Sequence, residues 1–251
     1  MGEAARSSPP GDPGSPTAGK TFPRGSPSRK HRSVSIHPEE RTGRVLVLAS
    51  ASPRRRDLLA AAGIPHVVRP AQVEEAAPGT AEPAALVEAN ARRKAEAVAR
   101  DCPGESVLGA DTLVVLAGEA LGKPADPDEA RRMLRRLSGQ VHEVHTGLCL
   151  CPASGGPPVV ARAVTRVHFR PLGEAVIEDY LRRVEVLDKA GAYALQEHGS
   201  LLVEQVAGAR DNVIGLPVTE VRALLRVHDP ALLPPAACVE SGERRDFPGA
   251  S

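Results

Sequence analysis

Hydrophobic runs and amphipathic stretches alternate along the middle of the chain, and this alternation predicts its secondary structure. Short apolar or alternating runs indicate strands over 45–49, 66–70, 107–116, 141–151, 159–169 and 201–206. Amphipathic stretches with start or stop signals indicate helices over 53–62, 83–101, 126–138, 174–184 and 218–227. The clearest helix start is Asp126, which is followed by Pro127 and by the acidic Glu129. This mixture predicts an α/β (α+β) fold with a mixed sheet.

The flanking segments lack this pattern. Residues 1–43 are rich in Ser, Pro, Gly and Arg, so folding would not bury enough apolar surface to offset the loss of chain entropy. We therefore expect a disordered N-terminal extension over 1–43, a folded domain over 44–228 and a disordered C-terminal tail over 229–251. The basic patch at 29–32 would suit an anionic partner, although a solvated tail is the simpler interpretation.

Composition narrows the classes of partner. The formal net charge is +1, aromatic residues make up 2% of the chain, and tryptophan is absent. The chain therefore lacks both the strong positive charge and the aromatic side chains that would favour stable nucleic-acid binding. No apolar run is long enough to cross a bilayer, and the first residues lack the apolar core of a signal peptide. We therefore expect no membrane partner and no signal peptide.

The four cysteines favour a reducing cytoplasm. Cys149 and Cys151, together with the distant Cys102 and Cys238, match no common zinc spacing. Cys149 and Cys151 alternate within a strand, so both face one side and are interpreted as small buried apolar residues. Free thiols of this kind are typical of cytoplasmic proteins.

The most informative stretch of the chain is 48–59. A strand ends in a loop that contains Ser50 and Ser52, and Ser52 is well placed as the N-cap of a helix with Pro53 in its first turn. Three arginines follow at 54–56. Backbone N–H groups, hydroxyls and guanidinium groups would meet at one helix N-terminus, an arrangement that suits a phosphate chain.

Carboxylates are the candidates for acid–base chemistry. Asp111 lies inside an otherwise apolar strand, where a carboxylate is costly to bury without a partner. It would act as a general base or a metal ligand, or else pair with an arginine at a strand end, and spacing alone does not decide. Glu74 and Glu75 are loop acids that are ordinarily solvated. Beside Asp111, however, one of them would complete an oxygen site for Mg²⁺ or Mn²⁺.

Two lysines and a glutamine complete the candidates. Lys94 lies in a predicted helix and either pairs with neighbouring acids on the surface or faces an anion. Lys123 lies between Gly122 and Pro124, which constrains its backbone and helps to aim its ammonium group. Gln196 follows a run of small residues and would contact a base edge through its amide, unless the segment is only a tight turn. Neither a P-loop motif nor a Rossmann glycine motif is present.

Several short motifs follow one another in a fixed order. They are Ser50-Ala51-Ser52-Pro53-Arg54-Arg55, Glu74-Glu75, Lys94-Ala95, Gly109-Ala110-Asp111-Thr112, Gly122-Lys123-Pro124, Leu137-Ser138-Gly139, His145-Thr146-Gly147, Asp188-Lys189-Ala190-Gly191-Ala192-Tyr193 and Gly215-Leu216-Pro217. Each motif alone is weak, whereas the ordered set is specific. In this order, over about 44–227, the chain resembles the Maf family of nucleoside triphosphate pyrophosphatases.

The resemblance implies a two-lobed fold like that of the inosine triphosphate pyrophosphatases, with the nucleotide in a central cleft. It implies hydrolysis of a nucleoside triphosphate between its α- and β-phosphates, which gives a monophosphate and pyrophosphate, with Asp111 as proton acceptor. Arg54, Thr112 and Gln196 match the family branch that acts on dTTP and UTP, whereas the 7-methyl-GTP branch carries other residues there. A homodimer is a further expectation from the family.

The remaining site residues take their expected roles from the same resemblance. The expected phosphate ligands are Ser52, Arg55 and Lys189. Lys94 and Lys123 would stabilise charge on the leaving pyrophosphate. Glu75 and Asp111 would hold a divalent cation, Mg²⁺ or Mn²⁺, which offsets the triphosphate charge and lowers the pKa of the attacking water.

Three functions stay open at this point. The first is a pyrophosphatase for dTTP and UTP. The second is a pyrophosphatase of the same chemistry that prefers modified pyrimidine triphosphates and keeps them out of nucleic acids. Glu197-His198 bears on that choice, because family members commonly have glycine after the glutamine at the position of Gln196. The third is a non-enzymatic nucleotide-binding regulator of cell division, which the complete set of Asp111, Lys94 and Lys123 disfavours.

Overall fold

The computed structural model describes residues 43–79 and 81–235. The expected N-terminal extension, apart from Gly43, and the tail from residue 236 onward lie outside the described residues, as does Cys238. No helix in the described part of the chain is long and apolar enough to cross a membrane. Cys149 and Cys151 are free and buried, as the sequence predicts, and Cys102 is free and buried as well.

Strands and helices alternate along the described chain, which confirms the predicted mixed α/β fold. The strands are β1 (Leu46–Leu48), β2 (His66–Val68), β3 (Val107–Leu116), β4 (Glu119–Leu121), β5 (Val141–Cys151), β6 (Val159–Phe169) and β7 (Val203–Ala207). The α-helices are α1 (Pro53–Ala61), α2 (Pro83–Ala99), α3 (Pro127–Leu137), α4 (Glu174–Arg183), α5 (Arg210–Ile214) and α6 (Val218–His228). The 3₁₀ turns are η2 (Ala190–Ala192), η3 (Gly199–Leu201) and η4 (Pro230–Leu232).

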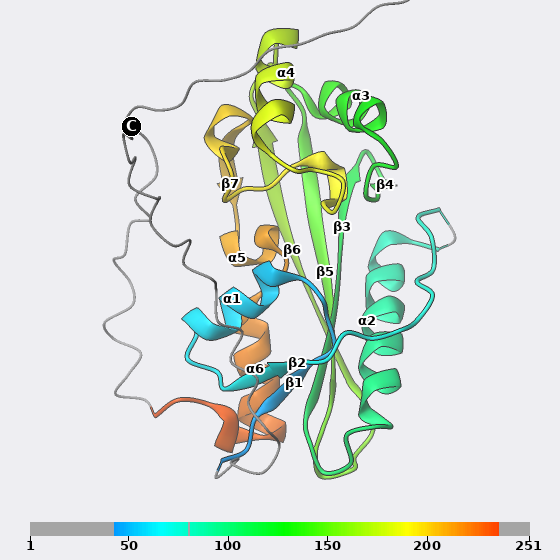
Figure 1. The fold of residues 1–251 in the computed structure, drawn as a ribbon, viewed down its shortest axis with the longest axis vertical. Coiled ribbons are helices and arrows are strands. Elements are labelled where there is room, and N and C mark those ends of the chain that lie inside the picture. Colours follow the sequence, from blue (N-terminus) through cyan, green and yellow to red (C-terminus); the bar gives the residue numbers. More distant parts are fainter. Residues whose placement is uncertain (1–42, 80, 236–251) are drawn as a thin grey trace, which may run out of the picture. The chain divides into compact units, whose positions relative to one another are not determined.

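The strands form one mixed sheet in the order β2-β1-β3-β5-β6-β7, with β4 paired to β3 (Figure 1). β1 runs parallel to both β2 and β3, and the other pairs are antiparallel. The chain leaves β1 through α1 to reach β2 on one side, and it returns through α2 to reach β3 on the other. The carboxyl end of β1 is therefore a topological switch point, which is where open α/β sheets bind ligands.

The strand pairing along one edge of β3 is interrupted at this switch point. β1 pairs with β3 only as far as Leu108, and β4 pairs with β3 only from Val114 onward. On its other edge β3 pairs continuously with β5. Asp111 and Thr112 therefore lie beside the gap between β1 and β4, on a strand that β5 holds in place.

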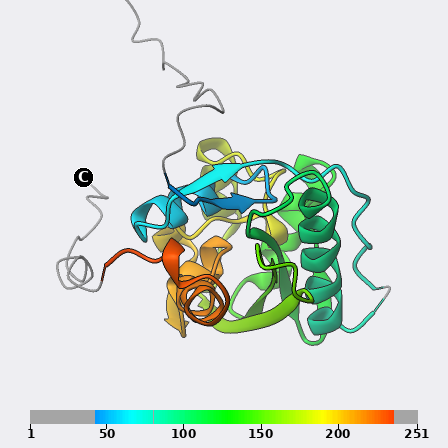
Figure 2. The ribbon, with the colours of Figure 1, turned by 90° about the horizontal axis from the view of Figure 1, so that it is seen from below.

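The two faces of the sheet carry different helices (Figure 2). On one face, Cys149 of β5 packs in a cluster with Ala91 of α2. On the other face, Leu148 packs with Leu59 of α1 and Leu225 of α6. Successive strand residues point to opposite faces, so α2 lies across the sheet from α1 and α6.

A second cluster covers the face of α1 and α6 farther along the strands. Val144 lies four residues before Leu148 on β5 and therefore on the same face, and it packs with Leu134 of α3 and Tyr180 of α4. The α1–α6 cluster and the α3–α4 cluster form two lobes on one face of the sheet. The two-lobed arrangement expected from the sequence is thus present.

Two glycines bring α2 very close to the other face. A Cβ atom at Gly109 of β3 would lie 2.1 Å from the Ala91 carbonyl oxygen, and one at Gly147 of β5 would lie 2.4 Å from the Val87 carbonyl oxygen. Any other residue would push the helix away, since such distances are far inside van der Waals contact. The backbone of α2 therefore packs directly on the sheet.

Most predicted elements are confirmed, and some local details differ. The Asp126 Oδ1 accepts a hydrogen bond from the Glu129 N–H at 2.7 Å and caps α3 as predicted. Ser52 is the N-cap of α1, but its side chain makes no cap hydrogen bond. The strand predicted over 201–206 starts only at Val203, because η3 occupies the preceding residues. The short helix α5 is an element that the sequence pattern did not predict.

The packed structure continues past the expected domain boundary at residue 228. The buried Asp229 accepts a hydrogen bond from the Ser106 hydroxyl at 2.7 Å and lies 3.2 Å from an Arg44 guanidinium nitrogen. Leu232 on η4 is buried in the α1–α6 cluster. Residues 229–235 thus differ from the expected disordered tail, because two adjacent leucines among prolines give no periodic pattern although Leu232 packs in the core.

A buried histidine lies among the aromatic residues of the α3–α4 lobe. The His142 Nε2 atom lies 2.8 Å from the Tyr193 hydroxyl, and the ring packs edge-on against Phe169 with centroids 4.9 Å apart. Burial lowers the pKa of His142 to about 4. The folded protein therefore holds this imidazole neutral at neutral pH.

Replacing Gly109 with alanine should destabilise the fold by roughly 2–3 kcal/mol, because the added methyl group forces α2 away from β3. Urea unfolding measures the change. Gly156→Ala is the matched control, since a Cβ atom there would meet only the Ser154 Oγ, at 3.9 Å. A Gly109→Ala variant as stable as the wild type would contradict the close packing of α2.

Stability should depend on pH through His142. Between about pH 6.5 and about pH 4 the unfolded chain protonates this histidine whereas the folded protein does not. The unfolded state then binds more protons, so stability falls as the pH falls through this window, by roughly 3 kcal/mol in total. Urea unfolding at several pH values should show a shallower dependence in His142→Gln than in the wild type. Equal slopes would show that His142 does not carry the effect.

Candidate active site

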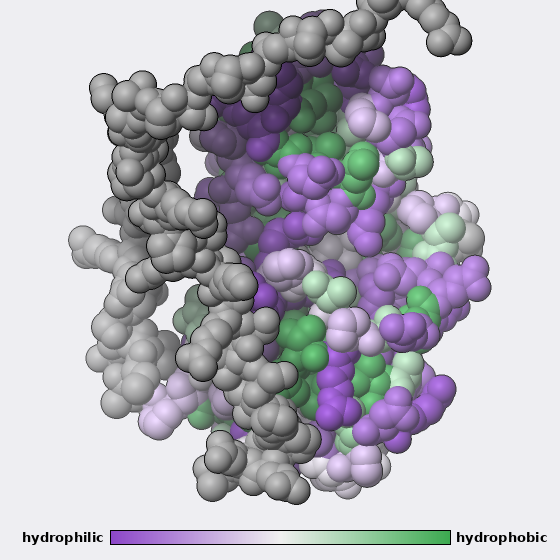
Figure 3. Space-filling view, in the orientation of Figure 1, coloured by the Kyte–Doolittle hydropathy of each residue, from purple (hydrophilic) through white to green (hydrophobic). Residues whose placement is uncertain are grey.

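An open cleft of about 470 Å³ lies at the carboxyl end of β1 and reaches residues of both lobes. Every site residue predicted from the sequence lines it: Ser52, Arg54, Arg55, Glu75, Lys94, Asp111, Thr112, Lys123, Lys189 and Gln196. Glu74, the neighbour of Glu75, is not among the lining residues. The fold thus gathers into one cleft residues that lie far apart in the sequence. On the face seen in Figure 3, the described surface is mainly hydrophilic.

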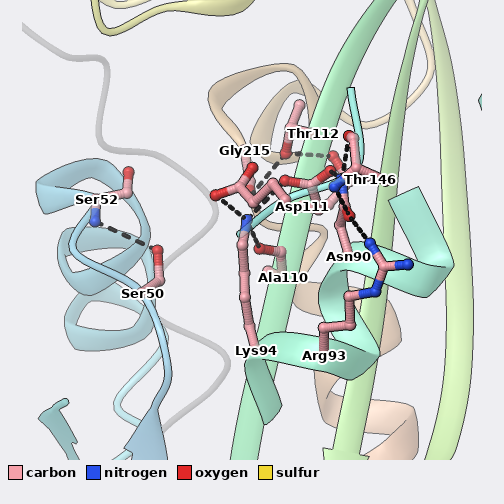
Figure 4. A network of polar contacts seen from close by, with 12 residues as sticks. Ser50, Ser52, Asn90, Arg93, Lys94, Ala110, Asp111, Thr112, Thr146 and Gly215 are labelled. Atoms are coloured by element: carbon pink, nitrogen blue, oxygen red, sulfur yellow. Dashed lines mark hydrogen bonds and ion pairs between the residues drawn. The ribbon is translucent and has the colours of Figure 1, made fainter. Parts of the chain in front are cut away.

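An ion pair between Asp111 and Lys94 forms the centre of the cleft (Figure 4). The Lys94 Nζ atom lies 2.7 Å from Asp111 Oδ1 and 3.0 Å from Glu75 Oε1, so one ammonium group joins two carboxylates. The side chain of Asp111 is 8% exposed, whereas that of Glu75 is 45% exposed. Asp111 is therefore the inner carboxylate and Glu75 the outer one.

Charges around the cleft keep Glu75 ionised. Burial by itself would raise the pKa of Glu75, but the charge and hydrogen bond of Lys94 outweigh it, with help from Lys123 and Arg55. The pKa of Glu75 consequently lies below its ordinary value. Both oxygens of this side chain are thus hydrogen-bond acceptors at neutral pH, and Oε1 pairs with Lys94.

Asn90 is a site residue that the sequence analysis missed. It is buried on α2, one turn before Lys94, and its Nδ2 donates to Asp111 Oδ2 at 3.2 Å (Figure 4). The same side chain also pairs with the backbone of Ala76, beside Glu75. The only signal in the sequence was a polar residue on the buried face of a helix, which is also common in ordinary cores.

Arg55 is a buried cation on the other face of β3. Its Nε donates to the Gly215 carbonyl at 2.8 Å, and its Nη1 and Nη2 donate to the hydroxyls of Ser50 and Thr112, both at 3.0 Å. Burial lowers the pKa of Arg55, although the charge of Asp111 acts in the opposite sense. A guanidinium group stays charged in proteins. Because the hydrogen-bond partners of Arg55 are a carbonyl and two hydroxyls, they do not neutralise its charge. An anion bound nearby would therefore stabilise this buried cation.

Arg54 and Lys189 share one carboxylate at the edge of the cleft. Asp188 Oδ2 lies 2.9 Å from Arg54 Nη1, and Asp188 Oδ1 lies 2.8 Å from Lys189 Nζ. Burial alone would raise the pKa of Asp188, but the hydrogen bonds from Lys189 and Arg54 lower it. Glu197 Oε1 lies 3.5 Å from Lys189 Nζ, so the charge that follows Gln196 has a cationic partner.

A tyrosine hydroxyl anchors the segment that carries Gln196. The Ala194 N–H donates to the Tyr180 Oη at 2.8 Å. Burial raises the pKa of Tyr180, so the hydroxyl stays protonated. This contact, which the sequence analysis did not foresee, fixes the backbone two residues before Gln196.

Glu75 and Asp111 are the cleft carboxylates that both pair with Lys94. No group of three or more His, Cys, Asp or Glu residues that could hold a metal ion occurs in the described structure. Mg²⁺ commonly binds through one or two carboxylates and completes its shell with substrate phosphates and water. The residues therefore fit a cation that is bound together with a phosphate ligand.

Comparison with known proteins identifies the family. The family model described as "Maf-like protein" matches residues 45–228. A dTTP/UTP pyrophosphatase from Moorella thermoacetica is 50% identical over 182 residues, which cover 72% of this chain and 94% of that protein. A protein of the same name from Anaeromyxobacter sp. (strain Fw109-5) is 54% identical over 186 residues, which cover 72% and 88%.

The chain also aligns with solved structures. A HAM1 protein from Coxiella burnetii aligns with 73% of this chain and 98% of its own, at 16% sequence identity and a TM-score of 0.44. The match to the family model and the identity to relatives over most of both chains decide the assignment. This chain belongs to the Maf family.

Proposed function

We propose that the protein is a nucleoside triphosphate pyrophosphatase that hydrolyses dTTP and UTP to the monophosphate and pyrophosphate. The observation that carries this proposal is the buried Asp111–Lys94 pair in a cleft lined by cationic side chains. Relatives about half identical to this chain are named dTTP/UTP pyrophosphatases. The proposal transfers that activity to this chain.

Asp111 is the proposed general base. Its carboxylate accepts a proton from water, whose oxygen then bonds to phosphorus while the bond between the α- and β-phosphates breaks. Lys94 and Asn90 each donate a hydrogen bond to one oxygen of Asp111, which fixes the orientation of the carboxylate. A held base of this kind contributes roughly 10²–10⁴-fold to a rate.

Cations around the cleft would bind the triphosphate. Arg55 is buried and held by neutral oxygens, so an anionic phosphate would stabilise its charge. Ser52 supplies a hydroxyl at the N-terminus of α1 that is not used as a cap. Lys189 would bind phosphate as well, and Lys94 and Lys123 would stabilise charge on the departing pyrophosphate.

The base would be recognised by three residues that line the same cleft, Arg54, Thr112 and Gln196. Arg54 and Gln196 carry donors and acceptors that match the carbonyls and the imide N–H of thymine or uracil. Thr112 completes the set, and its hydroxyl is already oriented by Arg55 and by Thr146, the latter at 3.0 Å. Asp188 holds Arg54 in position before a base is bound.

A divalent cation, Mg²⁺ or Mn²⁺, would be held by Glu75 and Asp111 together with the phosphates. When bound, it would offset the triphosphate charge and lower the pKa of the attacking water. Lys94 already lies within hydrogen-bond distance of both carboxylates. The carboxylates are thus gathered before any cation arrives.

The modified-pyrimidine alternative rests on the same chemistry and differs in the base. Glu197 bears on this choice, because its carboxylate directly follows Gln196 in the chain and lies 3.5 Å from Lys189 Nζ. Non-enzymatic regulation has no comparable support, because the cleft holds a complete set of acid–base and phosphate-binding groups. A homodimer and a link to cell division stay predictions from the family resemblance, and a cytoplasmic location stays a prediction from the cysteines.

Replacing Asp111 with asparagine should lower the turnover of dTTP by roughly 10²–10⁴-fold, because the amide cannot accept the proton from water. Released pyrophosphate measures the rate, and urea unfolding shows whether the variant is folded. Asp128→Asn, an exposed change on α3 outside the cleft, is the matched control and should keep the wild-type rate. Turnover unchanged by Asp111→Asn would refute the assigned role.

A further inference from the structure

Asn90 is a fully engaged buried amide next to the proposed base. Its Oδ1 accepts hydrogen bonds from the Ala76 N–H at 2.9 Å and from Arg93 Nη1 at 3.4 Å. Its Nδ2 donates to the Ala76 carbonyl at 3.1 Å and to Asp111 Oδ2 at 3.2 Å. The residue is 2% exposed, so water does not substitute for these partners. All the donors and acceptors of the carboxamide are used.

The pairing with Ala76 determines which way the amide points. The Ala76 N–H needs an acceptor and the Ala76 carbonyl needs a donor, so Oδ1 faces the first and Nδ2 faces the second. The second hydrogen of Nδ2 is then directed at Asp111 (Figure 4). A carboxylate at this position would lack the donor and repel Asp111, and an apolar residue would leave the half-buried backbone groups of Ala76 without this partner.

The contacts of Asn90 connect the two carboxylates that pair with Lys94. Asn90 and Lys94 lie one helical turn apart on α2, and each holds one oxygen of Asp111. Ala76 directly follows Glu75 in the loop that precedes α2. The 3.0 Å contact between Glu75 and Lys94 therefore requires the loop to be held against α2. The Asn90 side chain binds the loop backbone at Ala76.

We propose that Asn90 is a positioning residue that fixes the loop 71–79 on α2 and orients Asp111, so that Glu75 and Asp111 face one another across Lys94. This inference rests on the proposed pyrophosphatase function for its effect on the rate. Its structural part, the docking of the loop, stands independently of any substrate.

Hydrogen–deuterium exchange of the metal-free protein tests the structural part directly. In Asn90→Ala, a peptide that covers 71–79 should exchange roughly 10-fold or more faster than in the wild type, because the Ala76 amide loses its partner. Asn212→Ala is the matched control. It also removes a buried amide, which donates to the Val144 carbonyl and the Thr165 hydroxyl, and it should leave this peptide unchanged.

Kinetics test the link to the chemistry. With dTTP and Mg²⁺, Asn90→Ala should lower kcat roughly 10-fold or more while the KM for dTTP stays within about twofold, since the affected groups act on the reacting water. The Mg²⁺ concentration needed for half-maximal rate should rise as well. If Asn90→Ala does not fold, Asn90→Ser serves instead, because its hydroxyl is too short to reach both Ala76 and Asp111.

Two results would overturn the proposal. One is unchanged exchange of the 71–79 peptide in Asn90→Ala, and the other is a kcat equal to that of the wild type despite faster exchange. A wild-type protein without pyrophosphate release would instead refute the proposed function. In that case the exchange experiment would still decide whether Asn90 holds the loop.

Discussion

The close approach of α2 to the sheet is the constraint on which the cleft depends. Gly109 and Gly147 leave no room for a side chain between the strands and the helix backbone. At this separation the side chains of Asn90 and Lys94 reach Asp111, at 3.2 Å and 2.7 Å. A helix displaced by the thickness of a methyl group would break the buried ion pair and leave Asp111 uncompensated, which is strongly unfavourable.

The topology of the sheet explains why this pair faces a cleft rather than a core. β1 is short and β4 pairs with β3 only farther along, so the edge of β3 at Asp111 and Thr112 stays open. The α1–α6 lobe brings Arg55 to the cleft at this edge, and the segment that leads into η2 brings Lys189. A buried cation without a partner is unfavourable. Arg55 and Lys189 are placed where the negative charge of a triphosphate would neutralise them.

Local patterns in the sequence predicted most of the fold and the members of the cleft. The strand, loop and helix around Ser52 and the buried carboxylate Asp111 have strong local signals, and the ordered motifs added the rest. The pairing of Asp111 with Lys94 and the role of Asn90 were not predictable, because they depend on the distance between a helix and a sheet. The same holds for Leu232, whose burial depends on the position of α6 and not on any repeat of apolar residues.

The most direct test is pyrophosphate release by the wild-type protein from dTTP, UTP, CTP, 7-methyl-GTP and 5-substituted pyrimidine triphosphates, with Mg²⁺ or Mn²⁺ and with EDTA. We predict metal-dependent release from dTTP and UTP and little from CTP or 7-methyl-GTP. Higher kcat/KM for the 5-substituted nucleotides would favour the modified-pyrimidine alternative. Binding of triphosphates without release of pyrophosphate from any of them would contradict the catalytic role assigned to Asp111 and its cleft.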